Sequence, residues 1–123
     1  MGQCNRVIAI LDDEEHYRRA LSRLLKAHGY DVASFSAGEE RIAEMAQRPF
    51  DCVLLDLHMP GMTGFDVLAS LRGQPAPPPV IVITAHDDPD FVKKAIDLNA
   101  FECQMKPLAS PVLLGAIERA CAR

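Results

Sequence analysis

The stretch "VLLDLHMPGMTG", residues 53–64, places a carboxylate where a buried strand would meet a loop. Three apolar residues run directly into Asp56, and the turn-forming pair Pro60-Gly61 follows shortly after it. A short apolar run that ends at a turn signal is typical of a strand covered on both faces, as in a parallel sheet. The segment therefore predicts a central strand whose last residue is acidic and lies at a rim that solvent can reach.

Four further apolar runs alternate with longer amphipathic segments around this one, which is the pattern of successive βαβ units. The expected strands cover residues 7–11, 31–35, 52–56, 80–84 and 101–105, and the last is the least apolar, as suits a sheet edge. The expected helices cover residues 14–29, 38–47, 65–72, 90–98 and 111–122. The pattern predicts an α/β fold in which a parallel sheet is covered by helices on both faces.

Local signals mark the ends of two of these helices. Tyr17 and Leu21 belong to the apolar face of the first helix, and Gly29 is the glycine expected just after its end. Ser110 before Pro111 predicts an N-cap residue followed by a proline at the first helical position.

Composition narrows the classes of function. A chain of 123 residues has the size of one domain, so we expect a single domain over residues 1–123. The net charge of -4 leaves no excess of basic residues for direct nucleic-acid binding. No apolar run approaches the roughly 18 residues of a membrane span, and the four cysteines lack metal-ligand spacing. We therefore expect a soluble, cytoplasmic protein with reduced thiols and no membrane partner.

Polar side chains stand at the ends of four of the expected strands. Asp12 and Asp13 follow the first strand, Asp56 ends the third, Thr84 ends the fourth and Lys106 follows the fifth. In an open parallel sheet these carboxyl ends meet at one crevice, so the five side chains are expected to share a site. Three close carboxylates repel one another unless a cation joins them, and a few oxygen ligands suit Mg²⁺.

Four segments then carry a family resemblance that extends over essentially the whole chain. "ILDDEE" (10–15), "LLDLHMPGMTG" (54–64), "VIVITAH" (80–86) and "MKP" (105–107) resemble the signature segments of the receiver domain of bacterial response regulators. The likeness is closest to FixJ-like two-component regulators. It implies a doubly wound (βα)5 fold, flavodoxin- or CheY-like, with a five-stranded parallel sheet in the strand order 2-1-3-4-5.

The resemblance also implies a function. Asp56 would accept a phosphoryl group from a phosphohistidine of a sensor histidine kinase. Mg²⁺ would be held by the side chains of Asp13 and Asp56, by Asp12 through water and by the backbone carbonyl of His58. The protein would be a phosphoacceptor switch that catalyses only its own phosphorylation and dephosphorylation and controls an output domain or partner.

On phosphorylation, the resemblance implies that Thr84 and Lys106 move to meet the phosphoryl oxygens. The segment around residues 90–105 would move with them, and the face formed by residues 90–122 could join two copies into a homodimer. The Lys106–Pro107 bond resembles the cis peptide bond of the family.

Some positions depart from the family. Cys103 stands at the switch position, where the family usually has Tyr or Phe, and a small thiol cannot sweep the same volume. Phe101, two residues earlier, is expected on the same strand face and is a weak substitute. His58 and His86 flank the site and either tune hydrolysis of the acyl phosphate or are loop histidines with no role. Met105 is expected to be a packing residue.

Other functions remain open at this point. The chain could be a receiver fold that works chiefly as a docking or dimerisation module, since Cys103 and Leu108 replace expected aromatics. A Mg²⁺-dependent phosphatase with an aspartyl nucleophile is less consistent with the sequence, because His58 stands where such enzymes have a second acid. Each acidic residue alone could also be an ordinary helix-start or turn residue.

Overall fold

The computed structural model describes residues 6–36, 50–56, 64–73, 77–84, 89–106 and 109–122. The elements in these residues are β1 (Val7–Leu11), α1 (Glu15–Ala27), β2 (Asp31–Phe35), β3 (Cys52–Asp56), α3 (Gly64–Arg72), β4 (Val80–Thr84), α4 (Pro89–Asp97), β5 (Glu102–Met105) and α5 (Ser110–Cys121). The first four predicted strands have the predicted bounds, and the fifth begins one residue later than predicted. The helix predicted over residues 38–47 lies outside the described residues.

The five strands form one parallel sheet in the order β2-β1-β3-β4-β5, which confirms the predicted doubly wound fold. Because β1 pairs with both β2 and β3, the direction of winding reverses at β1. The crevice expected for a ligand in such sheets lies outside the carboxyl ends of the strands at this reversal. All residues of β3 and β4 are buried, whereas β2 and β5 are partly exposed edges.

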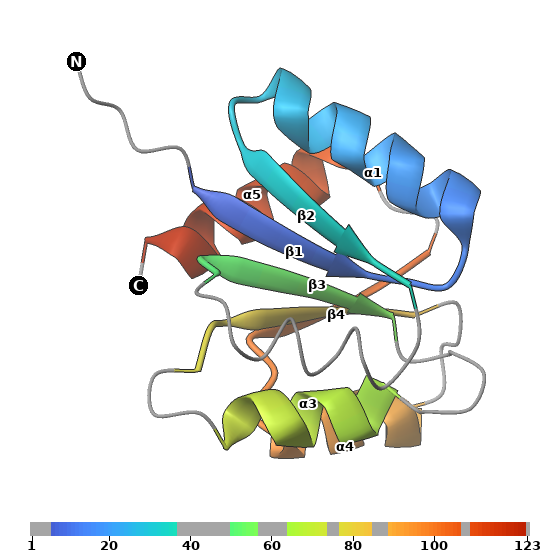
Figure 1. Ribbon diagram of the computed structural model, residues 1–123. Helices are drawn as coiled ribbons and strands as arrows, with labels where there is room; N and C mark the ends of the chain where they lie inside the picture. The colour runs from blue at the N-terminus through green and yellow to red at the C-terminus, as the bar shows by residue number, and fades with distance from the viewer. Residues whose placement is uncertain are drawn as a thin grey trace.

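Helices cover both faces of the sheet, as Figure 1 shows, with α1 and α5 on one side and α3 and α4 on the other. Alternate residues of the central strands supply the two apolar clusters beneath them. Ile8, Leu54 and Ile81 pack with residues of α1 and α5, and Leu11, Val53 and Val82 belong to the cluster that includes residues of α3 and α4. No helix among those described is both long and apolar enough to cross a membrane.

Two helices end in the same hydrogen-bonded motif with different residues. After α1, Gly29 adopts a φ of 88°, and Tyr30 donates its backbone N–H to the carbonyl of Leu25 at 3.1 Å. After α4, Asn99 adopts a φ of 73°, and Ala100 donates to the carbonyl of Ala95 at 3.0 Å. These are the left-handed C-terminal positions that glycine favours and asparagine tolerates.

The start of α5 differs by one residue from the prediction. Ala109 is the N-cap residue and makes no side-chain capping bond, and Ser110 is already helical. Pro111 still lies in the first turn, where its missing N–H leaves no helical hydrogen bond unmade.

Gly29→Ala should lower the free energy of unfolding by about 1 kcal/mol, because an L side chain strains a backbone with positive φ. Nothing lies within 4 Å of a Cβ at this position, so the loss would report the backbone alone. Gly115→Ala, inside α5, is the matched control and should raise the free energy by about 0.5–1 kcal/mol. Urea unfolding measures both, and a stabilising Gly29→Ala would contradict the assignment.

Candidate functional site

Three carboxylates converge at the carboxyl ends of β1 and β3. Asp12 and Asp13 directly follow β1, and Asp56 is the last residue of β3, which lies beside β1 in the sheet. One ligand oxygen from each of the three lies within 4.8 Å of the others. Asp12 and Asp56 are buried, at 2% and 6% exposure, whereas Asp13 is exposed. The structure therefore brings the three predicted acidic residues together.

Asp12 is held in place by hydrogen bonds to the end of β2 and to residues at the start of α1. Its backbone N–H donates to the carbonyl of Phe35 on β2 at 3.2 Å, and its own carbonyl accepts from Arg18 Nη1 at 2.6 Å. Its Oδ1 accepts the backbone N–H of Glu14 at 2.9 Å, just before α1 begins. Oδ2 is the carboxylate oxygen of Asp12 that faces the site.

Lys106 supplies the positive charge that faces these carboxylates. Its Nζ lies 3.2 Å from Asp12 Oδ2, 3.7 Å from Asp56 Oδ2 and 3.9 Å from Glu14 Oε1. Its backbone N–H donates to the carbonyl of Thr84 at 2.8 Å, which extends the pairing of β4 and β5 beyond Met105. This bond fixes the start of the lysine side chain, which is 17% exposed.

Thr84 is completely buried at the end of β4. Ile83, its neighbour in the chain, pairs with Asp56 on β3, so Thr84 lies one residue beyond the level of Asp56 in the sheet. The structure thus places all five side chains predicted for the site at the same edge of the sheet.

The charges of the site are unbalanced. Among the described residues, the formal charges of three aspartates and one lysine sum to -2, and two of the carboxylates are buried where charge is costly. A divalent cation would neutralise the excess, and clustered carboxylate oxygens are the ligands that Mg²⁺ prefers. The donor set therefore fits the predicted magnesium ion.

Tyr17 is a site neighbour that sequence reasoning assigned only to the apolar face of the first helix. Lys106 Nζ lies 4.3 Å from the centroid of its ring. Burial, followed by the charges of Asp12, Asp56 and Glu14, raises the pKa of Tyr17 to about 12, so the phenol is neutral at pH 7. Its place in the sequence could have indicated this, because Tyr17 lies in the first turn of the helix that begins just after Asp12 and Asp13.

Cys103 and Phe101 lie against different faces of the sheet, so the prediction that they share one face is wrong. Cys103 packs against the cluster that contains Ala95 and Ala100, and burial raises the pKa of its thiol. Phe101 packs against the opposite cluster, with residues of α5. The alternation of side chains holds only within a strand, and β5 begins after Phe101, at residue 102.

The remaining predicted positions are His58, His86, Pro107 and Leu108, and they lie outside the described residues. The metal-ligand role of the His58 carbonyl, the tuning roles of both histidines and the isomer of the Lys106–Pro107 bond therefore stay predictions.

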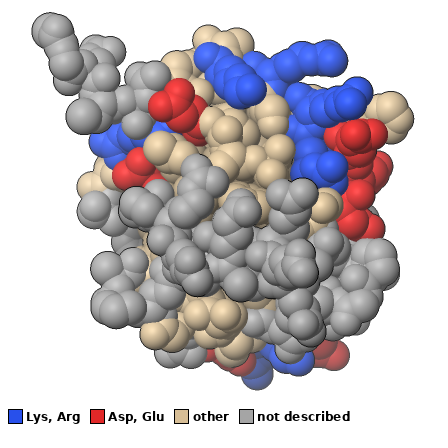
Figure 2. Space-filling view, in the orientation of Figure 1, with Lys and Arg blue, Asp and Glu red and all other residues tan. Residues whose placement is uncertain are grey.

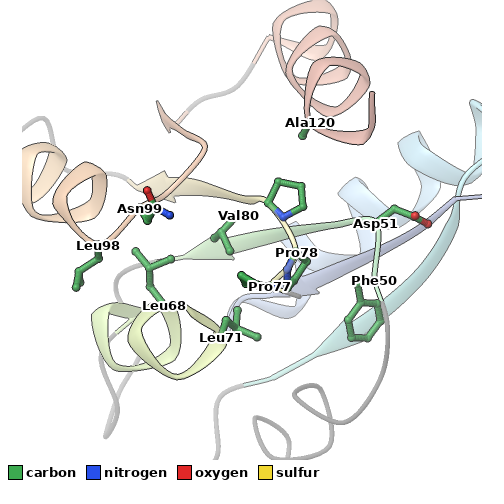
Figure 3. A pocket seen from close by; sticks show the side chains of 11 residues that line it. Phe50, Asp51, Leu68, Leu71, Pro77, Pro78, Val80, Leu98, Asn99 and Ala120 are labelled. Atoms are coloured by element: carbon green, nitrogen blue, oxygen red, sulfur yellow. The ribbon is translucent and has the colours of Figure 1, made fainter. Parts of the chain in front are cut away.

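A hollow of about 400 Å³ lies at the opposite edge of the sheet, where β3 and β4 begin. Figure 3 shows Phe50, Leu71, Pro77 and Val80 around it. Among the described lining residues the only ionisable one is Asp51, whose carboxylate accepts the backbone N–H of Val7 at 2.8 Å. This hollow therefore lacks the clustered charges that distinguish the aspartate site.

Comparison with known proteins gives a consistent match. Residues 8–118 match the response regulator receiver domain family. The chain is 36% identical over 117 residues to the transcriptional regulatory protein KdpE of Mycobacterium tuberculosis, covering 95% of this chain and 51% of KdpE. It is 36% identical over 114 residues to the response regulator protein TodT of Pseudomonas putida, covering 93% and 50%. The chain thus spans about half the length of these curated relatives.

Solved structures that superpose on this chain include proteins of the same kind. A response regulator receiver domain protein from Clostridium thermocellum superposes with a TM-score of 0.89 at 29% identity, covering 96% of this chain and 95% of that one. The chemotaxis protein CheY4 of Vibrio cholerae gives a TM-score of 0.87 at 26% identity, covering 95% and 99%.

Lys106→Met should lower the free energy of unfolding by about 1–3 kcal/mol in metal-free buffer, because buried carboxylates lose their counter-charge. Asp13→Asn should raise it by about 0.5–1 kcal/mol, because it removes one of three repelling charges. Urea unfolding with a chelator present measures both. Lys93→Met, at an exposed position of α4, is the matched control and should change the value by less than about 0.5 kcal/mol. A stabilising Lys106→Met would contradict this electrostatic account.

Proposed function

The chain belongs to the response regulator receiver domain family, and on this premise we propose that Asp56 is its phosphoacceptor. Receiver domains are phosphoacceptor switches of two-component signal transduction, which receive the phosphoryl group from histidine kinases. The assignment to Asp56 rests on the position of its carboxylate, which lies beside those of Asp12 and Asp13 and close to the ammonium of Lys106. Lys106 Nζ lies 3.7 Å from Asp56 Oδ2 and 3.2 Å from Asp12 Oδ2.

The residues for a magnesium ion follow from the same cluster. Asp13 and Asp56 would hold Mg²⁺ through their carboxylates, Asp12 through a water molecule, and His58 through its backbone carbonyl. Both carboxylate oxygens of Asp12 already face donors, Glu14 N–H and Lys106 Nζ, which favours an indirect role for this residue. The ion would supply positive charge that offsets the carboxylates and the incoming phosphoryl group.

The chain's own side chains then divide the reaction between them. An oxygen of the Asp56 carboxylate attacks phosphorus as the phosphorus–nitrogen bond of the phosphohistidine breaks, and the histidine of the kinase leaves. The transition state carries its charge on the equatorial oxygens, which the ammonium of Lys106 is close enough to stabilise. Thr84, at the end of β4, would donate its hydroxyl to the phosphoryl group in the product and so report phosphorylation to β4 and the segment after it.

The return reaction is part of the same proposal. Water attack on the acyl phosphate of Asp56 would restore the carboxylate, so the chain would turn over its own phosphoryl group and no external substrate. His58 and His86, two residues after Asp56 and Thr84, would influence this rate by ordering or excluding water. As a single receiver domain over residues 1–123, the chain would act on an output domain or a separate partner.

The surface beside the site suits an anionic partner. A hollow on α1 is lined by four basic residues and by Glu15, which pairs with one of them; we call the basic residues, Arg18, Arg19, Arg23 and Lys26, the α1 basic surface. Figure 2 shows Lys and Arg side chains gathered over α1, with acidic side chains beside them at the edge of the molecule. This surface would attract an acidic face of the sensor histidine kinase and bring its phosphohistidine toward Asp56.

A second candidate function is self-association through the 90–122 face. Ile96 on α4, Met105 on β5 and Val112 on α5 are 48%, 46% and 56% exposed, so the prediction that Met105 is a packing residue is wrong. The same range also carries charged groups, among them Arg119, whose Nη2 lies 2.8 Å from Glu102 Oε1. Exposed apolar side chains framed by charges favour a second copy of the chain as the partner.

Treatment with acetyl phosphate and Mg²⁺ should add the mass of one phosphoryl group to the intact protein, and Asp56→Asn should abolish the addition. Asp13→Asn should slow it because the metal loses a ligand. Asp97→Asn, an exposed position on α4, is the matched control and should react as the wild type does. Intact-protein mass spectrometry gives the readout, and a full mass shift in Asp56→Asn would exclude this residue as the phosphoacceptor.

Phosphorylation should convert the chain from monomer to dimer in sedimentation velocity, and Val112→Glu should weaken the dimer at least about tenfold by placing a charge in the apolar contact. Ala27→Glu, exposed on α1, is the control and should leave assembly unchanged. Identical sedimentation of the phosphorylated and unphosphorylated forms would instead favour a docking role in which phosphate does not alter assembly.

A further inference from the structure

The aromatic ring of Tyr17 is the one neighbour of the Lys106 ammonium, among its described contacts, that carries no formal negative charge. Lys106 Nζ lies over the ring at 4.3 Å from its centroid, and its other contacts are the carboxylates of Asp12, Asp56 and Glu14. Tyr17 lies in the first turn of α1, which begins at Glu15, shortly after the two aspartates that follow β1. A cation over the face of an aromatic ring is attracted by the negative potential of that face.

We propose that Tyr17 is a positioning residue of the phosphorylation site, which holds the Lys106 ammonium toward Asp56 through the face of its ring. The inference rests on the proposed function of the Asp56 site and names a further residue on which that function depends.

The geometry gives the ring a role that the carboxylates cannot fill. Asp12 and Asp56 would attract Lys106 less strongly once a metal ion, bound directly by Asp56 and through water by Asp12, offsets part of their charge. The ring attracts the ammonium in either case, because its quadrupole does not depend on metal or proton binding. Tyr17 would therefore keep Lys106 directed into the site at the stage when the phosphoryl group arrives.

The hydroxyl of Tyr17 is not the group that acts. It is buried and has no hydrogen-bond partner among the described residues, so no hydrogen bond of the hydroxyl anchors the ring or holds Lys106. Below the ring, a hollow of about 200 Å³ lies between α1 and α5, lined by Leu21, Leu24 and Leu113 among others. The ring thus borders loosely filled space on one side and an ammonium on the other, which distinguishes it from an ordinary core aromatic.

Two variants distinguish the effect of the ring face on the phosphorylation rate from the effect of the hydroxyl. Tyr17→Phe keeps the face and should phosphorylate at a rate within about twofold of the wild type, because the attraction to Lys106 resides in the ring. Tyr17→Leu keeps an apolar side chain against α5 but removes the face. It should lower the rate constant with acetyl phosphate and saturating Mg²⁺ by about three- to tenfold. Urea unfolding of both variants would show that each is folded under the assay conditions.

A double-mutant cycle tests whether Tyr17 acts through Lys106. In a Lys106→Met background, Tyr17→Leu should change the phosphorylation rate by less than about 1.5-fold, because the ammonium that the ring positions is absent. An equal loss in both backgrounds would overturn the inference, and so would a loss in Tyr17→Phe as large as that in Tyr17→Leu.

A measurement on the unphosphorylated protein keeps the test independent of the proposed function. Proton NMR should show the ε-methylene signals of Lys106 shifted upfield by the ring in the wild type and in Tyr17→Phe, and restored to ordinary positions in Tyr17→Leu. If the wild type fails to accept a phosphoryl group, the proposed function is wrong, and this shift still decides whether the ring holds Lys106. If the wild type is phosphorylated and the shift is missing, the inference alone is overturned.

Discussion

Crowded negative charge at one edge of the sheet is the constraint around which this molecule is built. Asp12 and Asp56 are buried side by side with Asp13 at the rim, an arrangement that repulsion and desolvation both oppose. Lys106, fixed by the backbone bond to Thr84, offsets part of this charge from the fifth strand. The carboxylates still repel one another, and binding of a cation would relieve this repulsion. The feature that opposes folding of this site would therefore also favour the divalent metal proposed for it.

The fold tolerates this unfavourable arrangement because burial of apolar side chains stabilises the sheet. β3 and β4 are buried throughout, and the two apolar clusters cover both faces of the central strands. Burial of a Leu, Ile or Val side chain contributes about 1.5–3 kcal/mol, so a few strand residues outweigh one unfavourable charge contact. Parallel strands also bring all their carboxyl ends to one edge, which places residues as distant in sequence as Asp12 and Lys106 within 3.2 Å.

The strands and the main site residues could be predicted because each depends on a local pattern. A short apolar run predicts a strand, and a polar residue at the end of that run predicts a site residue, as at Asp56 and Thr84. The contact of Tyr17 with Lys106 joins the first turn of α1 to the residue after β5, and the position of Tyr17 near the acidic residues indicates its place but not this partner. The predicted face of Phe101 was wrong because β5 begins one residue later than predicted, and strand ends are the part of an element that sequence locates least well. The predicted burial of Met105 was wrong because β5 is an edge strand and leaves this side chain exposed.

If Asp56 is phosphorylated as proposed, Cys103 would limit how strongly the phosphoryl group biases the conformation of this chain. Reversing a population from 1:99 to 99:1 requires about 5.5 kcal/mol, and charge-assisted hydrogen bonds contribute about 1.5–3 kcal/mol each. An aromatic residue at this position, which the family resemblance implies, would add about 1.5–3 kcal/mol by its burial on switching. The thiol of Cys103 already packs against the cluster containing Ala95 and Ala100, so it has little surface left to bury. The contacts of Lys106 and Thr84 with the phosphoryl group would then have to supply nearly all the bias, which makes the orientation of Lys106 more consequential here than in a chain with the aromatic switch.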